Sequence, residues 1–164
     1  MPTRNSTAGR AFGADPVTTT TTNGLPGGML AYTTGTPMTG ITAVVNLTGM
    51  SLTITPPTNR DLKITVLMHA YISSALTSGD TFQVQLQRDG VTGQIWIMRC
   101  DQQNVQVTLC GYAFDFQTDG NPHTYLLRGG RLGGTGTYAA IANGTALGVT
   151  LTSWFAIEDV GVHF

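Results

Sequence analysis

The residues of this 164-residue chain that could do chemistry are few and scattered. The three histidines, His69, His123 and His163, share no fixed spacing and stand in no run of acidic residues or cysteines. Folding could still assemble a triad or a metal site from them, since separation along the chain does not forbid it. No serine lies in a nucleophile-elbow context, however, and the acidic residues fall mainly in expected turns. We therefore predict that the protein is not an enzyme and that it holds no metal and no cofactor.

Two other motifs invite a chemical interpretation that their context does not favour. Glu158-Asp159 is the one adjacent pair of carboxylates; it could ligate Ca²⁺, but hydrogen bonding at the end of the last strand is the favoured interpretation. The glycine cluster from Gly129 to Gly136 superficially resembles a phosphate-binding loop. It lacks the Gly-Lys-Ser/Thr ending, and a β segment is expected after it instead of a helix. We predict a wide turn there, with several residues at positive φ.

The cysteines and the large aromatic residues each leave two interpretations open. Cys100 and Cys110 are the only cysteines, too few for a disulfide framework and without the histidine partners of a zinc site. Two buried free thiols are favoured over a disulfide between strands. Trp96, Tyr112 and Trp154 could stack on a sugar ring, although packing in the core or at an interface is favoured.

The composition points to β structure and excludes some partners. Charged residues make up only 10% of the chain, with a single Lys and a single Glu, whereas long solvated helices normally carry many of both. The net charge of −1 provides no basic face for nucleic acid. No apolar run approaches the roughly 18 residues of a membrane span, and the N-terminus lacks the apolar core of a signal peptide. We expect a soluble protein made in a cytoplasm, with no nucleic acid and no membrane as partner.

The clearest secondary-structure signal is a hairpin over Thr81–Cys100. Phe82, Val84 and Leu86 alternate with polar residues, as in a strand with one buried face. Asp89-Gly90 can adopt the positive φ angles of a tight turn, and a second β-rich run follows it. The apolar face of one hairpin needs a second sheet to cover it.

Further strand-like runs are separated by turn residues at roughly 8 to 12 residue spacing, the rhythm of an all-β sandwich. They are Met29–Tyr32, Ile41–Val45, Leu52–Thr55, Leu62–Ser73, Val105–Phe116, His123–Leu127, Tyr138–Ala142 and Leu147–Ile157. With the hairpin they predict about ten antiparallel strands and no helix, in a sandwich domain over residues 24–164. Shared phase along the strands predicts a core of Ile64, Val66, Met68, Phe82, Val84, Leu86, Val149, Leu151 and Phe155.

Two of the expected strands, Leu62–Ser73 and Val105–Phe116, carry apolar residues in both phases. Exposing the second phase on a monomer would invite aggregation, so we expect it to face a neighbouring subunit around a threefold axis. The predicted interface residues are Leu67, His69, Tyr71, Tyr112 and Phe114.

Residues 1–23 form an expected N-terminal arm. They include five consecutive threonines, Thr18–Thr22, and too few apolar residues to offset the entropy of ordering them. Two interpretations are open: a disordered tail, or an extended arm that orders only against another subunit. In the second, the arm binds the particle through Arg4, Arg10, Phe12 and Val17, the arginines pairing with an acidic shell.

The C-terminal pattern Gly130-Arg131-Leu132-Gly133-Gly134-Thr135-Gly136-Thr137, followed by Trp154–Gly161, resembles the closing segment of small virion proteins of tailed actinobacteriophages, the minor tail and head decoration proteins. The resemblance extends back through His123-Thr124-Tyr125 and the Thr81–Arg88 strand, and covers residues 24–161. It implies a jelly-roll sandwich, similar to the tumour-necrosis-factor and complement globular heads, that assembles as a homotrimer. It implies no catalytic residues.

Three function classes follow. The leading hypothesis is a structural virion protein, made in the host cytoplasm, that binds the major capsid or tail protein as an oligomer. The short arm, without a fibre shaft, favours a stand-alone decoration or capping protein over a fibre tip. The alternative is a receptor-recognition module of a phage tail that binds a host surface glycan. The third class, an enzyme acting on cell-wall sugars, needs a carboxylate pair that no part of the sequence places in a promising context.

Overall fold

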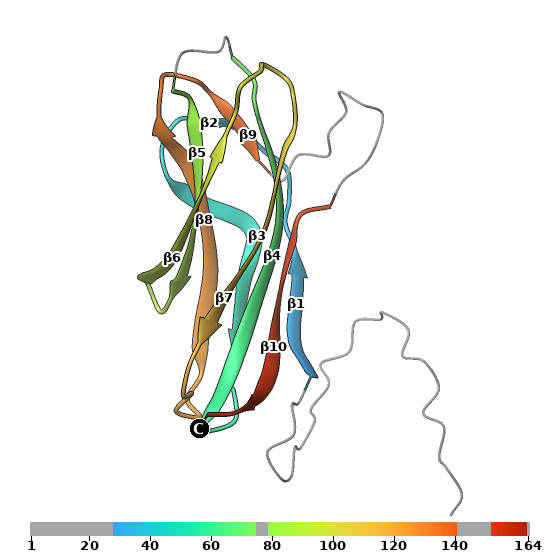
Figure 1. Ribbon diagram of the computed structural model, residues 1–164, viewed down its shortest axis with the longest axis vertical. Coiled ribbons are helices and arrows are strands. Elements are labelled where there is room, and N and C mark those ends of the chain that lie inside the picture. The colour runs from blue at the N-terminus through green and yellow to red at the C-terminus, as the bar shows by residue number, and fades with distance from the viewer. Residues whose placement is uncertain (1–27, 75–78, 141–151, 164) are drawn as a thin grey trace, which may run out of the picture.

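The computed structural model describes residues 28–74, 79–140 and 152–163, which form two antiparallel sheets packed face to face (Figure 1). The expected boundary at Gly24 and all four arm residues, Arg4, Arg10, Phe12 and Val17, lie outside this part of the chain. The all-β prediction is confirmed. The strands are β1 (Gly28–Thr34), β2 (Met38–Ile41), β3 (Val45–Ile54), β4 (Arg60–Ile72), β5 (Thr81–Arg88), β6 (Val91–Arg99), β7 (Val107–Asp115), β8 (His123–Gly133), β9 (Tyr138–Ala140) and β10 (Trp154–Val162).

The strand order is that of a jelly roll. In the first sheet, β7 pairs with one edge of β4, while β10 and then β9 pair with the other edge. Outside these, β1 pairs with β10 and β2 pairs with β9. The second sheet has the order β3-β8-β5-β6. The pairs β1–β10, β3–β8, β4–β7 and β5–β6 are therefore nested one inside another, which is the connectivity of two Greek keys wrapped into a sandwich.

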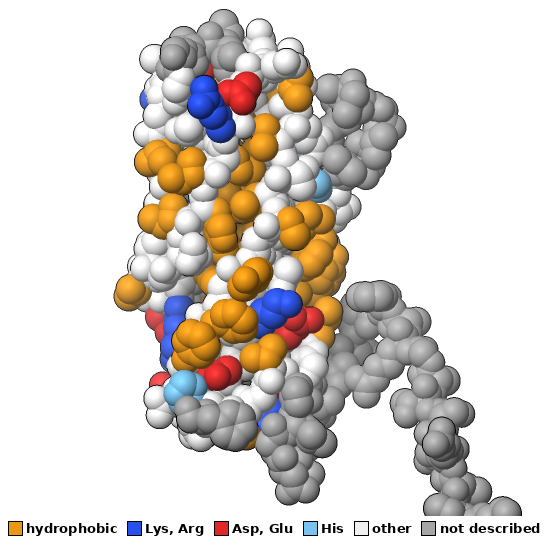
Figure 2. Space-filling model, viewed as in Figure 1, with side chains coloured by type: hydrophobic (Ala, Val, Ile, Leu, Met, Phe, Trp, Pro, Cys, Tyr) orange, Lys and Arg blue, Asp and Glu red, His pale blue; other side chains and the backbone are white. Residues whose placement is uncertain are grey.

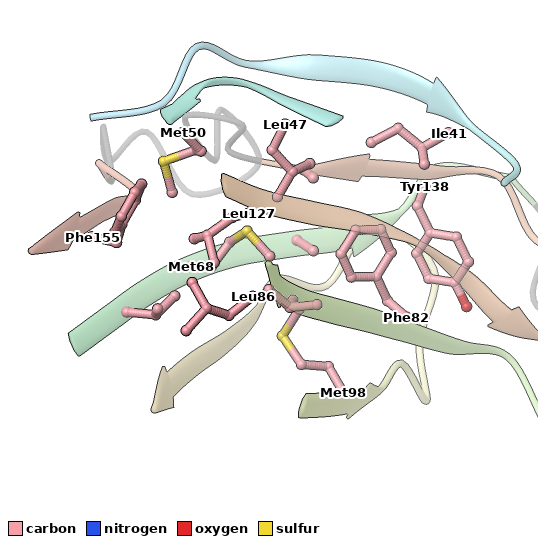
Figure 3. Packing of buried hydrophobic residues seen from close by; sticks show 14 of the residues in the cluster. Ile41, Leu47, Met50, Met68, Phe82, Leu86, Met98, Leu127, Tyr138 and Phe155 are labelled. Atoms are coloured by element: carbon pink, nitrogen blue, oxygen red, sulfur yellow. The ribbon is translucent and has the colours of Figure 1, made fainter. Parts of the chain in front are cut away.

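The core lies between the sheets and follows the predicted phase. Of the nine predicted core residues, the seven within the described ranges are all buried, while Val149 and Leu151 lie outside those ranges. Phe82 packs against Tyr138 with ring centroids 5.2 Å apart, and Figure 3 shows the two rings side by side. Burial of this alternating set is what selects the strand register, because a shift by one residue would turn every core side chain outward.

The glycine cluster corrects one prediction. Instead of ending at Leu127, β8 continues to Gly133, so the predicted wide turn is wrong over most of its length. Only Gly134 within the cluster has a positive φ, of 78°. Gly129 and Gly130 are small for another reason: a Cβ on Gly129 would lie 2.8 Å from Cζ of Phe82, and one on Gly130 would lie 2.3 Å from the Ala43 carbonyl oxygen. These glycines permit close approach inside a strand.

The expected strand Ile41–Val45 is also corrected, because β2 ends at Ile41 and β3 begins only at Val45. The residues between cross the face of β8 at Gly130.

Near the ends of β4 and β10, Asp159 accepts from Nε of Arg60 at 3.0 Å, and both side chains are buried. Asp159 Oδ1 also accepts from the Gly161 N–H at 3.0 Å. The neighbouring Glu158 points to the opposite face, where Oε2 lies 3.7 Å from Nζ of Lys63. The adjacent carboxylates therefore have separate partners: Asp159 accepts hydrogen bonds, whereas Glu158 only lies at ion-pair distance from Lys63. The expected hydrogen-bonding pair at the end of the last strand is thus seen for Asp159 alone, and both residues stand within β10, which continues to Val162.

Candidate functional site

The outer face of the β1-β10-β4-β7 sheet collects exposed aromatic residues. Side chains along β7 alternate between the two faces of the sheet: Ala113 points into the sandwich, whereas Tyr112 and Phe114 point outward. Register places Tyr112 opposite Thr65 and places Trp154 of β10 opposite Leu67. Figure 2 shows hydrophobic side chains gathered over this side of the molecule. We call the group the aromatic face; its members are Tyr32, Leu67, Tyr112, Phe114, Phe116 and Trp154.

The aromatic face is ordered by contacts between rings. Tyr112, which is 62% exposed, meets Phe114 edge-on with centroids 5.7 Å apart, and Phe114 stacks on Phe116 at 5.5 Å. At the opposite margin of the same outer face, the ring centroids of Tyr32 on β1 and Trp154 on β10 lie 6.0 Å apart. The face therefore consists of rings already held against one another, which limits the side-chain entropy that a partner would have to remove.

The five predicted interface residues occupy this face unequally. Leu67, Tyr112 and Phe114 lie on it together, and Tyr71 is half-buried further along β4. His69 is only 5% exposed, and its Nδ1 lies 2.9 Å from Thr108 Oγ1. Burial lowers the pKa of His69, which favours the neutral ring. A neighbour covering the face would contact His69 little, and the interface role of all five remains a prediction.

The aromatic face also includes residues that phase alone did not assign to an interface. Phe116 continues the outward phase of Tyr112 and Phe114, a signal present in the sequence. Tyr32 joins Trp154 only because β1 pairs with β10, and no local pattern reveals that pairing.

The two thiols are free, as favoured, but their burial differs from the prediction. Cys100 is 2% exposed, and burial, followed by the charges of Asp101 and Asp80, raises its pKa to about 11. Cys110 is exposed, because it follows the outward phase of β7 opposite Leu67. The prediction of two buried thiols is therefore wrong for Cys110.

A second feature is a polar cluster where β5 and β8 meet the turns at one end of the sandwich. His123 Nδ1 lies 2.6 Å from Asp89 Oδ2, and its Nε2 lies 2.8 Å from Asp119 Oδ1. Arg88 Nη2 also approaches Nε2, at 2.6 Å. Nε2 can donate to Asp119 only when it carries a proton, and can accept from Arg88 only when it does not. The two contacts therefore belong to two protonation states of one ring.

The charges around His123 favour its protonated form. Burial lowers the pKa of His123, but the carboxylates of Asp119 and Asp89 outweigh burial and raise the pKa above its usual 6.5. In return, the Asn121 N–H and then His123 hold the pKa of Asp119 well below its usual range. The Thr124 N–H and then His123 lower the pKa of Asp89. The sequence showed these acids as turn residues and did not show that they surround a histidine.

A third feature is a groove of about 470 Å³ between β6 and β7, where one side of the sandwich is open. Further along these strands the sandwich is closed, because Trp96 of β6 packs directly on Gly111 of β7; a Cβ there would lie 2.8 Å from Nε1 of the indole. Arg88 and Asp115 stand at the polar end of the groove, with Nη1 of Arg88 2.7 Å from Oδ1 of Asp115.

Across the described ranges, no three His, Cys, Asp or Glu side chains are arranged to hold a metal ion. The described ranges also contain no helix long and apolar enough to cross a membrane. The chain matches no protein-family model and no curated protein.

Proposed function

We propose that the chain is a structural protein of a tailed-phage virion, which assembles as a homotrimer through its aromatic face and attaches to the major capsid or tail protein. The observation that carries the proposal is the aromatic face itself. Its exposed rings lie together on one sheet, and the charged pair beside them, Lys63 and Glu158, is partly exposed with its charged atoms 3.7 Å apart. Such a pair contributes little to stability. Enrichment in aromatic residues is typical of protein interfaces, whose rim also holds partly exposed charged residues.

A second copy of the chain is the occupant that best suits this face. The aromatic residues occur on both margins of one sheet, at β1–β10 and at β7, so one copy can offer a different margin to each of two neighbours. Contacts of this head-to-tail kind close into a ring when the rotation allows it. The resemblance to trimeric virion proteins supports a ring of three and supplies the virion as the location.

Light scattering after size-exclusion chromatography tests the assembly. The wild type at micromolar concentration should elute with three times the mass of the chain. Replacing both Tyr112 and Phe114 by Ser should shift it toward monomer, since truncating central aromatic residues of an interface commonly costs about 2–4 kcal/mol, or about 30- to 1000-fold in association. Both residues are exposed in the single chain, so its melting temperature should change little.

Ile97→Ser is the matched control. Ile97 is 59% exposed, close to the 62% of Tyr112, but it belongs to β6 in the other sheet. It should leave the trimer intact. A wild-type monomer at these concentrations would refute the trimer, and equal loss of assembly in the control would refute the aromatic face as its site. The virion location is tested separately by immunolabelling purified particles, where absence of the protein would contradict it.

A further inference from the structure

The groove between β6 and β7 is a surface separate from the proposed trimer interface. It opens at the side of the sandwich, and Phe114 is the one residue that it shares with the aromatic face. Its volume of about 470 Å³ lies within the usual range for small-ligand sites. Its floor is apolar and reaches the core through Ile64, Leu86 and Ala113, which come from three strands in two sheets. The floor can therefore take the apolar face of a ligand.

The other end of the groove is polar, and its groups are held in place before any ligand arrives. Asp115 is fixed between Arg88, at 2.7 Å, and the hydroxyl of Tyr125, which donates to its second oxygen. Asp89 is fixed by the Thr124 N–H at 2.8 Å. Gln94, half-buried on β6, completes this end with an amide. Gln94 Nε2 donates one hydrogen to the Ile95 carbonyl at 3.1 Å. The remaining N–H groups of the guanidinium and of the amide supply donors, and the carboxylates and the amide oxygen supply acceptors.

These features restrict the class of ligand. The lining holds one cation, Arg88, against two anions, Asp89 and Asp115, so a phosphate or carboxylate ligand would meet a net negative charge. The mixture of fixed donors and acceptors suits groups that both donate and accept, which is a property of hydroxyls. An apolar floor beside such groups matches a pyranose, which has one face of C–H bonds and a rim of hydroxyls. We propose that this groove binds a neutral saccharide ring.

Titration of the ¹⁵N-labelled full chain with methyl glycosides of glucose, galactose, mannose and N-acetylglucosamine tests the proposal. A single ring should bind weakly, with a dissociation constant on the order of 1 mM. At least one glycoside should shift the amide signals of Ala113, Asp115 and Gln94. The methyl glycoside of N-acetylneuraminic acid, a charged sugar, should cause no such shift.

Two variants locate the binding. Ala113→Leu extends a floor side chain into the groove and should weaken glycoside binding at least tenfold, whereas Ala43→Leu makes the same change at an exposed position outside the groove and should leave binding unchanged. Gln94→Ala removes one polar partner from an edge strand and should weaken binding several-fold, which preserves the test if Ala113→Leu fails to fold.

The proposal is overturned if no glycoside shifts the groove signals at ~50 mM, a concentration far above the expected dissociation constant. It is also overturned if N-acetyl-phenylalanine amide shifts them and no glycoside does, since the groove would then be a socket for a protein side chain. Unchanged glycoside binding in both groove variants would place the sugar elsewhere and would likewise contradict it.

Discussion

Cys100 and Cys110 show how the position of a residue in its strand decides its chemistry. Cys110 projects from the outer face of β7, opposite Leu67, while Cys100 is buried immediately after β6. Thiolate is the reactive form of cysteine, and a pKa of about 11 leaves Cys100 almost entirely as the thiol near neutral pH. Modification of Cys110 therefore reports on the outer face of the sheet, and the unreactive Cys100 serves as an internal control.

We predict that iodoacetamide at about pH 8 modifies Cys110 and spares Cys100 until the protein is unfolded. Mass spectrometry of peptides after timed quenching measures both rates. In the Tyr112/Phe114 double Ser variant, Cys110 should react faster than in the assembled wild type, because a neighbouring subunit would no longer cover it. Rapid modification of Cys100 in the native protein would contradict the burial of this residue.

His123 makes stability depend on pH in a direction that can be worked out. Its pKa is raised in the folded state, so the stability it contributes is fully present below the unfolded value of 6.5 and is lost as pH rises through the folded pKa. The pKa values of Asp89 and Asp119 are lowered, so their contribution is present above the unfolded value of 3.8 and is lost as pH falls. The cluster is most stabilising between these limits.

Thermal melts of the wild type and His123→Asn test this dependence. The melting temperature of the wild type should be higher than that of the variant. This difference should be largest near pH 5–6 and should shrink as pH rises to about 9. Asn has no proton to lose in this range, so it serves as the reference. A difference that grows with rising pH would mean that the His123 pKa is lowered in the folded state, and the assignment of its partners would be wrong.

At the scale of elements, β8 is the strand on which the second sheet depends, since it pairs with both β3 and β5. Its glycines allow the chain between β2 and β3 to cross its outer face and allow Phe82 to pack on its inner face. Neither approach leaves room for a Cβ. The strand therefore tolerates the entropic cost of glycine in exchange for contact with both neighbours.

Gly130→Ala should destabilise the protein by about 1–3 kcal/mol, because the new Cβ would meet the backbone of Ala43, which cannot rotate away. Gly93→Ala on β6 is the matched control, since a Cβ there meets no atom within 4 Å. Urea unfolding of the two variants compares them directly. Equal free energies of unfolding for the two variants would show that the segment between β2 and β3 moves away from residue 130 at little cost, contrary to the close packing described.

The elements that could be predicted are those set by burial of each residue within its own strand. The alternation of Phe82, Val84 and Leu86 indicated strand, phase and buried face at once, because each position reports its own environment. The end of β8 could not be predicted, since the need for glycine there comes from Ala43 and Phe82, which are distant in sequence.

The candidate sites divide in the same way. Tyr112 and Phe114 could be assigned to an outward face from their phase in β7. The surroundings of His123 could not be predicted, because Asp89 approaches this ring only when β5 pairs with β8. In that register Arg88 lies opposite Tyr125, which places the neighbouring Asp89 beside His123. The groove depends on the gap between β6 and β7, two strands of different sheets, and no local pattern records that gap.

At the scale of the whole molecule, we expect attachment to the virion and folding of the sandwich to be separable. None of the described strands lies within residues 1–23, since β1 begins at Gly28. We therefore propose that the arm supplies no part of the sandwich and contributes through contacts with other chains of the particle. Fully extended, 23 residues reach at most about 80 Å, which is enough to cross from one subunit to another.

Deleting residues 2–23 should leave the melting temperature and the trimer unchanged and should weaken attachment to the virion. Purified full-length and truncated protein would be added to particles that lack it, and their occupancies compared. Full-length protein with Arg4 and Arg10 both replaced by Gln should fall between the two, because charge pairing with an acidic shell would be lost while the rest of the arm remains. Equal occupancy for all three would leave the arm as a tail without a role in attachment.

The nested pairing of strands has a consequence for how the chain folds. Within the described ranges, β1 pairs only with β10, β2 only with β9 and β3 only with β8, so the first three strands have no partner among themselves. During synthesis, β1, β2 and β3 emerge from the ribosome before β10, β9 and β8, the strands with which they pair. Until then their edges are unpaired and can associate with other nascent chains. Closing such long loops before any contact rewards them is slow, so folding should take milliseconds to seconds or longer. Because charged residues make up only 10% of the chain and its net charge is −1, charge repulsion would do little to keep these open edges apart, so the interval before the last strand is made is when nascent chains are most exposed to aggregation.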